Sequence, residues 1–186
     1  MPTPMAAPVA PLRTAHLTLV PATAAHVRAE LASRAGLAAL LGAEVPASWP
    51  PGEYDRGAQE YFLARLDEGG DALVGWLGWY AVRDADDAAP ATVVGAGGYF
   101  GPPGDDGVVE IGYSVTPEWR GRGYARELVA ALVAHALSRR GVRQVVAHTG
   151  DANAASIAVL ERCGFVREGS GVEPDSARFV HAGAGR

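Results

Sequence analysis

The N-terminal third of the chain combines one alternating segment with several segments of helical spacing. Residues 12–20 alternate between apolar and polar side chains, which predicts a strand. Helical spacing predicts helices at residues 26–35, 38–41 and 54–67. Thr23 is a plausible N-cap for the first of these helices. Pro50 and Pro51 exclude a regular helix between the second and the third.

Strands dominate the middle of the chain, and helices alternate with strands after it. Strand-forming residues, separated by hairpin signals, predict strands at residues 72–82, 92–100 and 108–115. An i, i+3, i+4 stripe of apolar residues then predicts a helix at residues 126–139, which Gly141 ends. The remaining elements are a strand at 144–149, a helix from Asn153 to Gly164, and weak strands at 166–172 and 178–181.

This order of elements predicts the α+β class, with a mixed, mostly antiparallel central sheet flanked by helices. A length of 186 residues is typical of one domain, which we expect to span residues 12–181. Residues 1–11 are rich in proline and alanine and are interpreted as a flexible leader, and residues 182–186 as a flexible tail. The alanine- and glycine-rich segment 176–186 leaves open whether a last strand is completed.

Composition and charge argue against several classes of function. The net charge of −5 gives no nucleic-acid footprint, and no apolar run reaches the roughly 18 residues that span a membrane. The histidines lack metal-ligand spacing, so we expect no metal site. Cys163 is the single cysteine, which excludes an intramolecular disulfide and fits a cytoplasmic protein. It is interpreted as a core residue rather than a nucleophile.

The segment from Val115 to Ala125 carries the strongest chemical signal. A predicted strand leads into a turn with two arginines and two glycines, and a helix follows. Glycines let the backbone approach a ligand closely, and the first amides of a helix favour an anion. Arginines add charge-assisted contacts to phosphate oxygens. The arrangement therefore predicts a pyrophosphate site.

Two motifs resemble the GCN5-related N-acetyltransferase (GNAT) superfamily. Arg120-x-x-Gly123-x-Ala125 is similar to the superfamily's Q/R-x-x-G-x-G/A signature, and the helix from Asn153 to Gly164-Phe165 is similar to its last helix. The branch with the RimJ/RimL-type N-terminal acetyltransferases of ribosomal proteins is the most similar. The resemblance implies acetyl-CoA as co-substrate and an amine as acceptor. A Walker A loop is excluded because the chain contains no lysine.

The resemblance also implies which residues hold the co-substrate. Val115 would pair with the pantetheine arm through its backbone, as an added strand would. Asn153 would reach the same ligand, or would only cap its helix; the sequence leaves both open. The residues implied to hold the pyrophosphate are Arg120, Gly121, Arg122, Gly123, Tyr124 and Ala125.

The resemblance places the catalytic residues on the predicted strand at residues 108–115, before the glycine-rich turn. Glu110 is the first choice for the base that deprotonates the amine, although a solvent-exposed or arginine-paired carboxylate is the alternative. Backbone amides near Tyr113 would stabilise the oxyanion. Leu160 stands where many members carry a tyrosine that protonates the leaving thiolate. Either the thiolate leaves without a dedicated acid, or another hydroxyl, that of Ser114 or Tyr113, serves instead.

The acceptor is not specified by the sequence. The α-amine of a protein N-terminus is slightly favoured over a small amine such as an antibiotic, a polyamine or an amino acid derivative. Trp49, in the region where the superfamily varies its acceptor site, is either a pocket wall or a packing residue. A non-catalytic CoA-binding module and an unrelated enzyme with a surface Arg-Gly loop are the other interpretations. A homodimer is compatible with the superfamily.

Overall fold

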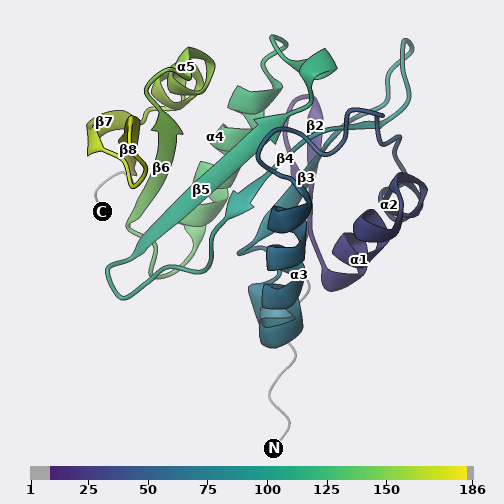
Figure 1. Cartoon of the computed structure of the whole chain (residues 1–186), viewed down its shortest axis with the longest axis horizontal. Coiled ribbons are helices and arrows are strands. Elements are labelled where there is room, and N and C mark those ends of the chain that lie inside the picture. The colour runs from purple at the N-terminus through teal and green to yellow at the C-terminus, as the bar shows by residue number, and fades with distance from the viewer. Residues whose placement is uncertain (1–8, 184–186) are drawn as a thin grey trace, which may run out of the picture.

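Within residues 9–183, the part of the chain that the computed structural model describes, eight strands form one sheet in the order β1-β2-β3-β4-β5-β6-β8-β7 (Figure 1). The strands are β1 (Leu12–Arg13), β2 (Leu17–Pro21), β3 (Gly78–Arg83), β4 (Thr92–Tyr99), β5 (Val108–Val115), β6 (Gln144–Gly150), β7 (Val166–Ser170) and β8 (Ser176–Ala182). Of the neighbouring pairs, β5 and β6 are parallel and the others antiparallel. The predicted α+β class is therefore confirmed.

Helices cover both faces of this sheet (Figure 1). On one face lie α1 (Ala24–Ala32), α2 (Arg34–Leu41) and α3 (Arg56–Gly69). On the other lie α4 (Tyr124–Ser138) and α5 (Ala154–Arg162). The short 3-10 helices are η1 (Gly70–Leu73) and η2 (Pro117–Trp119). None of the helices within residues 9–183 is long and apolar enough to cross a membrane.

A hydrophobic core lies on each side of the sheet. Leu128, Leu132 and Ala136 recur every fourth residue of α4 and are fully buried against the strands, as the predicted apolar stripe requires. The opposite core joins the first three helices to the sheet through residues that include Val27, Leu37, Leu66 and Tyr80. β5 lies between the two cores, and the candidate site lies at its C-terminal end.

Local signals set the helix starts. The hydroxyl of Thr23 accepts a hydrogen bond from the amide of His26, which confirms Thr23 as the N-cap of α1. Asp55 caps α3 in the same way by accepting from the amide of Ala58. Both helix starts lie within two residues of the positions that the sequence predicts.

Two predicted strands depart from the structure by more than two residues. Residues 12–20 do not form one strand, because a turn closed by the amide of Thr14 and the carbonyl of Leu17 separates β1 from β2. The strand predicted at residues 72–82 begins at Gly78, because η1 and a turn at Gly75, with φ of +86°, occupy its first part. Propensity alone cannot distinguish a strand from such an apolar turn.

The C-terminal segment completes the sheet. β8 lies between β6 and β7, and its Ala177 and Phe179 are buried. Alternation of these side chains with Arg178 is the pattern of a strand that packs on one face. Val9 packs against the core on the α4 side, before the domain start expected at residue 12. Residues 1–8 of the expected leader and 184–186 of the expected tail lie outside the described residues.

Glu127 fixes the start of α4 to the N-terminal strands. One carboxylate oxygen accepts hydrogen bonds from the amides of His16 at 2.6 Å and Leu17 at 3.1 Å, and from the hydroxyl of Thr14. Burial alone would raise the pKa of Glu127, but the hydrogen bonds from Thr14 and His16 outweigh it and lower this pKa. An ionised carboxylate therefore holds the β1–β2 turn against the helix that positions the glycine-rich turn.

Glu127→Gln is expected to lower the free energy of unfolding by about 1–2 kcal/mol near neutral pH, because an amide cannot accept all of these hydrogen bonds. The pKa of Glu127 is lowered in the folded state, so its contribution is present above the ordinary value of 4.5. It is lost as the pH falls through the lower, folded-state pKa. Urea unfolding of both proteins at several pH values measures this, and a constant difference would contradict it.

Candidate active site

β5 and β6 separate part-way along their length. They pair in parallel as far as Ile111 with Ala147. β5 nevertheless continues to Val115 and β6 to Gly150, without further pairs between them. The sheet is therefore forked at this point, and the fork opens toward the turn that leads into α4 (Figure 1).

The backbone of Tyr113 and Val115 points into the fork. On the β4 side, the carbonyl of Glu110 accepts a hydrogen bond from the amide of Phe100 at 3.1 Å. Backbone groups of successive residues alternate between the two neighbouring strands, so the amides of Tyr113 and Val115 face away from β4. The carbonyl of Val115 accepts from Nε of Arg120 at 2.9 Å and keeps a second lone pair.

The turn after η2 presents bare backbone. Gly121 has φ of +73° and Gly123 has φ of +86°, a region that favours glycine. No described atom lies within 4 Å of a Cβ placed at either glycine. Gly123 is the N-cap of α4, so no side chain caps the helix there. The first amides of α4 therefore have no side-chain cap, and a helix start of this kind suits an anion.

Trp119 supports this turn and contacts two arginines. The guanidinium carbon of Arg122 lies 4.7 Å from the centre of the ring, and that of Arg83 lies 5.4 Å from it. Arg122 also donates to the carbonyl of Glu118 at 3.3 Å. Arg122 is thus held beside the turn and remains exposed. Tyr124 packs its ring 6.1 Å from that of Trp119.

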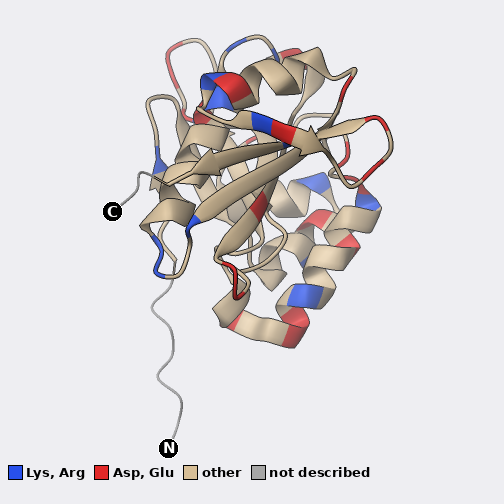
Figure 2. Ribbon diagram, turned by 90° about the vertical axis from the view of Figure 1, so that its left-hand side faces the viewer, with Lys and Arg blue, Asp and Glu red and all other residues tan. Residues whose placement is uncertain are grey.

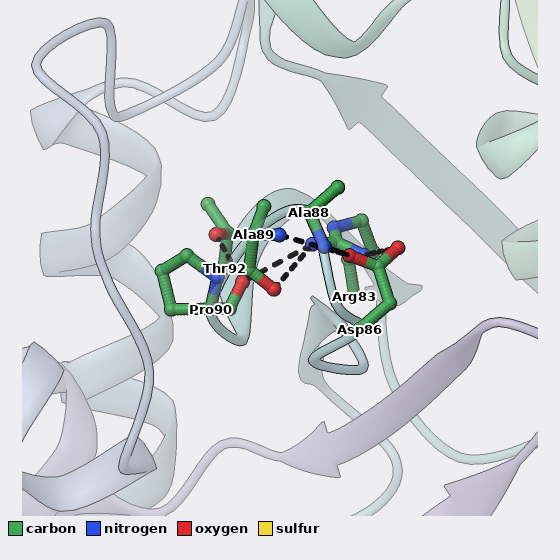
Figure 3. Close-up of polar contacts among 6 residues, drawn as sticks. All are labelled: Arg83, Asp86, Ala88, Ala89, Pro90 and Thr92. Carbon is green, nitrogen blue, oxygen red and sulfur yellow. Dashed lines mark hydrogen bonds and ion pairs between the residues drawn. The ribbon is translucent and has the colours of Figure 1, made fainter.

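Arg83 is a buried residue that closes the β3–β4 hairpin (Figure 3). It donates to the carboxylate of Asp86 at 2.8 Å and to the carbonyls of Ala89 at 2.9 Å and Pro90 at 3.3 Å. Its position under Trp119 links this hairpin to the glycine-rich turn. Arg83 was not predicted from the sequence, and no local signal separates it from other strand-end arginines.

Glu110 pairs with a histidine that was likewise not predicted from the sequence. Its carboxylate lies 3.0 Å from Nδ1 of His148. The Glu110 side chain is 39% exposed and the His148 side chain 19%, so solvent reaches the carboxylate. Glu110 pairs with Val146 on β6, which places His148 on the same face just past the last pair. The pair therefore stands where the strands separate, and only the strand register could have revealed it.

A cavity of about 310 Å³ lies between α3 and the strands β3, β4 and β5. Of the predicted catalytic residues, Tyr113 and Ser114 line it and Glu110 does not. Gly112, two residues from Glu110 on the same face, does line it. The other lining residues are Glu53, Tyr54, Ala58, Tyr61, Phe62, Gly78, Trp79, Tyr80, Ala96, Gly97, Gly98, Tyr99 and Phe100.

Comparison with known proteins decides the family. The sequence model described as "Acetyltransferase (GNAT) domain" matches residues 16–166 of this chain. The chain belongs to the GNAT family. A curated relative, the uncharacterized N-acetyltransferase YjdG of Bacillus subtilis (strain 168), is 29% identical over 141 residues, which cover 76% of this chain and 77% of the relative. This GNAT protein is an N-acetyltransferase.

Solved structures share the GNAT fold. RimL, a ribosomal L7/L12 alpha-N-protein acetyltransferase in complex with CoA, is 20% identical, with a TM-score of 0.63, and covers 91% of this chain and 95% of its own. A spermidine N-acetyltransferase from Vibrio cholerae, in complex with CoA and spermine, is 18% identical, with a TM-score of 0.62, and covers 91% of this chain and 96% of its own. These likenesses establish the fold.

The GNAT fold brings Tyr113 to the start of α5. Its hydroxyl lies 2.9 Å from Oγ of Ser156 and donates to the carbonyl of that residue at 3.1 Å. Burial raises the pKa of Tyr113 to about 12, so the hydroxyl remains protonated at neutral pH. Leu160, one turn further along α5, is fully buried and offers no proton. Tyr113 is thus a protonated hydroxyl close to the fork.

Asn153 and Cys163 lie at the two ends of α5, and each makes a contact that stabilises the helix or its packing. The side-chain oxygen of Asn153 accepts from the amide of Ser156 at 3.1 Å and caps the helix, which leaves its NH₂ group for a ligand. At the other end, burial raises the pKa of Cys163, and its sulfur lies 3.5 Å from the carbonyl of Arg126. These properties fit a packing thiol better than a nucleophile.

A buried polar cluster around Glu30 lies on the side of the sheet that α1, α2 and α3 cover. Trp49 is buried, its indole N–H donates to Glu30 at 2.6 Å, and it does not line the cavity, so it is a packing residue. Glu53 and Tyr54 do line the cavity.

Within residues 9–183, no three histidine, cysteine, aspartate or glutamate side chains could together hold a metal ion.

The residues of this GNAT chain fit acetyl-CoA. The bare glycines at the start of α4 leave room for a pyrophosphate, and the exposed guanidinium groups of Arg120 and Arg122 stand beside them. The amides of Val115 and Tyr113 face the fork, where an extended pantetheine arm would replace the missing strand contacts. The fit therefore rests on the open glycine turn, on the backbone amides of the fork and on the positive charge of the two arginines.

Proposed function

We propose that this protein transfers the acetyl group of acetyl-CoA directly to a primary amine. Acetyl-CoA, when bound, supplies an activated thioester. The observation that carries the proposal is the fork between β5 and β6, because residues 112–115 border the fork and lead into the glycine-rich turn. Residues 112–114 also line the cavity. A single segment of β5 can therefore contact both substrates.

Backbone groups would bind and polarise the thioester. The amides of α4 and the side chains of Arg120 and Arg122 would hold the pyrophosphate, with Gly121, Gly123, Tyr124 and Ala125 shaping the turn. Val115 would pair with the pantetheine arm. The amide of Tyr113 would donate to the thioester carbonyl oxygen, where negative charge develops during attack.

Glu110 would take the proton from the attacking amine. A protonated amine has no lone pair, so it cannot attack until a base removes a proton. The Cα atoms of Glu110 and Gly112 are about 7 Å apart on a strand, so the carboxylate would reach an amine in the cavity through water. His148, whose Nδ1 lies 3.0 Å from the Glu110 carboxylate, would orient that carboxylate.

Tyr113 is the better of the two candidates for the group that protonates the departing thiolate. Its hydroxyl is protonated at neutral pH and lies on the α5 side of β5, next to Ser156. Ser114 lines the cavity on the opposite face, where the acceptor would lie. The acceptor itself is either a protein N-terminal amine or a small amine, and the family match does not separate them.

Glu110→Gln is expected to lower kcat/KM about 100-fold at a pH below the amine pKa, because general-base assistance is lost. The loss should shrink as the pH approaches the pKa of the acceptor amine, about 8 for an N-terminal α-amine and about 10 for an alkylamine, because the free amine then becomes abundant without a base. His148→Gln should lower the rate about tenfold with a similar pH trend. The Kd of acetyl-CoA should change in neither variant, and a loss that is independent of pH would contradict the role.

The proposed activity is tested by the release of CoA thiol from acetyl-CoA in the presence of a broad panel of amines. Release that depends on the amine and is reduced in Glu110→Gln supports direct transfer. Tight binding of acetyl-CoA without release from any amine would favour a non-catalytic CoA-binding module. Failure to bind CoA would remove the proposal altogether.

A further inference from the structure

Three glycines form the floor of the cavity beneath α3. Gly78 on β3 pairs with Gly98 on β4, and Gly98 pairs with Gly112 on β5. Paired residues of neighbouring strands point their side chains to the same face of a sheet. This row across the sheet therefore carries no side chain, and all three glycines line the cavity.

Aromatic rings form the walls of the cavity. Tyr61 and Phe100 line the cavity and are 49% and 53% exposed. The hydroxyls of Tyr54 and Tyr80 donate at 2.9 Å and 2.7 Å to Glu30, which does not line the cavity. These two tyrosines therefore offer the cavity their rings rather than their hydroxyls.

The remaining tyrosine hydroxyls of the lining are mostly engaged elsewhere as well. The hydroxyl of Tyr99 donates to the carbonyl of Leu132 at 2.6 Å, and that of Tyr113 bonds to Ser156. Both partners lie in helices on the opposite face of the sheet. A lining that contains five tyrosines is consequently much less polar than its composition indicates.

Charge is almost absent from the cavity. Among the described lining residues, Glu53 alone carries a formal charge, and it is exposed. Figure 2 shows the strands uncharged for most of their length, with the charged residues mainly on helices and loops. A second ammonium group in this cavity would lose its water, and the exposed carboxylate of Glu53 is the sole charged partner among the described lining residues, so its burial is costly. The cavity therefore disfavours acceptors with several positive charges.

We propose that the acceptor is a primary amine attached to one uncharged aromatic or branched aliphatic group, which this cavity receives. The volume of about 310 Å³ lies near the lower end of ligand pockets and suits one ring or a short branched chain. The inference rests on the proposed acetyl transfer, because Gly112, Tyr113 and Ser114 both line the cavity and border the fork. A free amine and the N-terminal residue of a peptide share this chemistry.

The experiment compares kcat/KM for matched amines at saturating acetyl-CoA. The apolar members are 2-phenylethylamine, 3-methylbutylamine and a tripeptide with N-terminal phenylalanine. The charged members are spermidine, kanamycin and a tripeptide with N-terminal aspartate. We expect at least one apolar member to exceed every charged member by about 100-fold. Whether the apolar peptide or the free amines react faster identifies the source of the acceptor.

A matched pair of variants on α3 tests the cavity itself. Ala58 lines the cavity, whereas Ala64 is exposed on the same helix and does not. Ala58→Asp should lower kcat/KM for the best apolar amine about tenfold or more, and Ala64→Asp should leave it nearly unchanged. Calorimetric titration of that amine in the presence of CoA should show the same difference in Kd. Melting temperatures establish that both variants fold.

The outcomes separate this inference from the proposed function. Release of CoA that is fastest with spermidine or kanamycin, or equal effects of the two aspartate variants, would overturn the apolar acceptor and leave acetyl transfer intact. The absence of release with every amine would overturn acetyl transfer and the acceptor class with it. A preference for apolar amines that Ala58→Asp removes would support both.

Discussion

Glu30→Ala is expected to lower the free energy of unfolding by about 4 kcal/mol, because it leaves several buried donors without an acceptor, each costing about 1–3 kcal/mol. For a chain of this size, such a loss lowers the melting temperature by about 8–16 °C. Glu30 is buried, and its carboxylate accepts four hydrogen bonds from side chains. No other described carboxylate joins so many separate elements of the fold.

The two carboxylate oxygens of Glu30 have different partners. One accepts from the indole N–H of Trp49 at 2.6 Å and from the amide group of Gln59 at 2.9 Å. The other accepts from the hydroxyls of Tyr54 at 2.9 Å and Tyr80 at 2.7 Å. Trp49, Gln59 and Tyr80 are themselves buried, so water cannot easily replace the lost acceptor. α1 is thereby joined to α3, to β3 and to the loop between α2 and α3.

Glu30→Gln is the matched control. The carbonyl oxygen of the introduced amide can accept from Trp49 and Gln59, whose nitrogens are donors only. Its NH₂ group can donate to the two tyrosine hydroxyls, which can rotate to accept. We therefore expect Glu30→Gln to keep most of the stability that Glu30→Ala loses. Similar losses in the two variants would contradict the hydrogen-bond account.

The pH dependence gives a second readout. Burial raises the pKa of Glu30 above its ordinary value of 4.5, and the hydrogen bonds from Tyr80, Trp49, Tyr54 and Gln59 only partly oppose this. The folded state therefore binds the proton more tightly than the unfolded state. The stability of the wild type relative to Glu30→Gln should be greatest below about pH 4.5 and should fall as the pH rises through the folded-state pKa.

The neighbouring side chain of His26 also has a shifted pKa, and its effect must be separated from that of Glu30. The ring of His26 lies 5.9 Å from that of Tyr80, and burial lowers the pKa of His26. Protonation of His26 therefore destabilises both proteins as the pH falls, with the opposite sign to the effect of Glu30. Denaturant unfolding of both proteins across pH isolates Glu30, because the contribution of His26 cancels in the difference. A difference that rises with pH would contradict the raised pKa.

Sequence reasoning succeeded where the signal is local. The glycine-rich turn, the strand before it and the helix after it follow one another in the chain, so their arrangement could be predicted from one continuous stretch, residues 108–139. The cap at Thr23 is likewise decided by a residue three positions away. Such features depend on backbone propensity and short-range hydrogen bonds, which a single sequence contains.

Sequence reasoning failed where partners are distant in the chain. Glu30 meets Trp49, Gln59 and Tyr80 across 19, 29 and 50 residues, and Glu110 meets His148 across 38. These contacts depend on strand register and helix packing. Neither can be predicted from the spacing of residue types along a single sequence. The cavity floor is a further example, because Gly78, Gly98 and Gly112 become one surface only through the pairing of three strands.

Gly123→Asp is expected to raise the Kd of CoA and acetyl-CoA about 100-fold relative to Gly123→Asn, which equals about 2.8 kcal/mol. Gly123 is the N-cap of α4, with φ of +86°. A Cβ at this position meets no described atom within 4 Å, and aspartate and asparagine tolerate this backbone region better than other side chains. Both variants should therefore fold with similar melting temperatures.

The two side chains of this pair have nearly the same shape and differ in charge. A carboxylate at the start of α4 would occupy the place where the helix amides favour an anion, and it would repel the pyrophosphate at close range. The asparagine variant imposes the same backbone strain without this repulsion, so the ratio of the two Kd values reports electrostatics alone. Because salt screens exposed charges, the ratio should fall as the ionic strength rises. Calorimetry at low and high salt measures it, and equal Kd values for the two variants would place the pyrophosphate somewhere other than the start of α4.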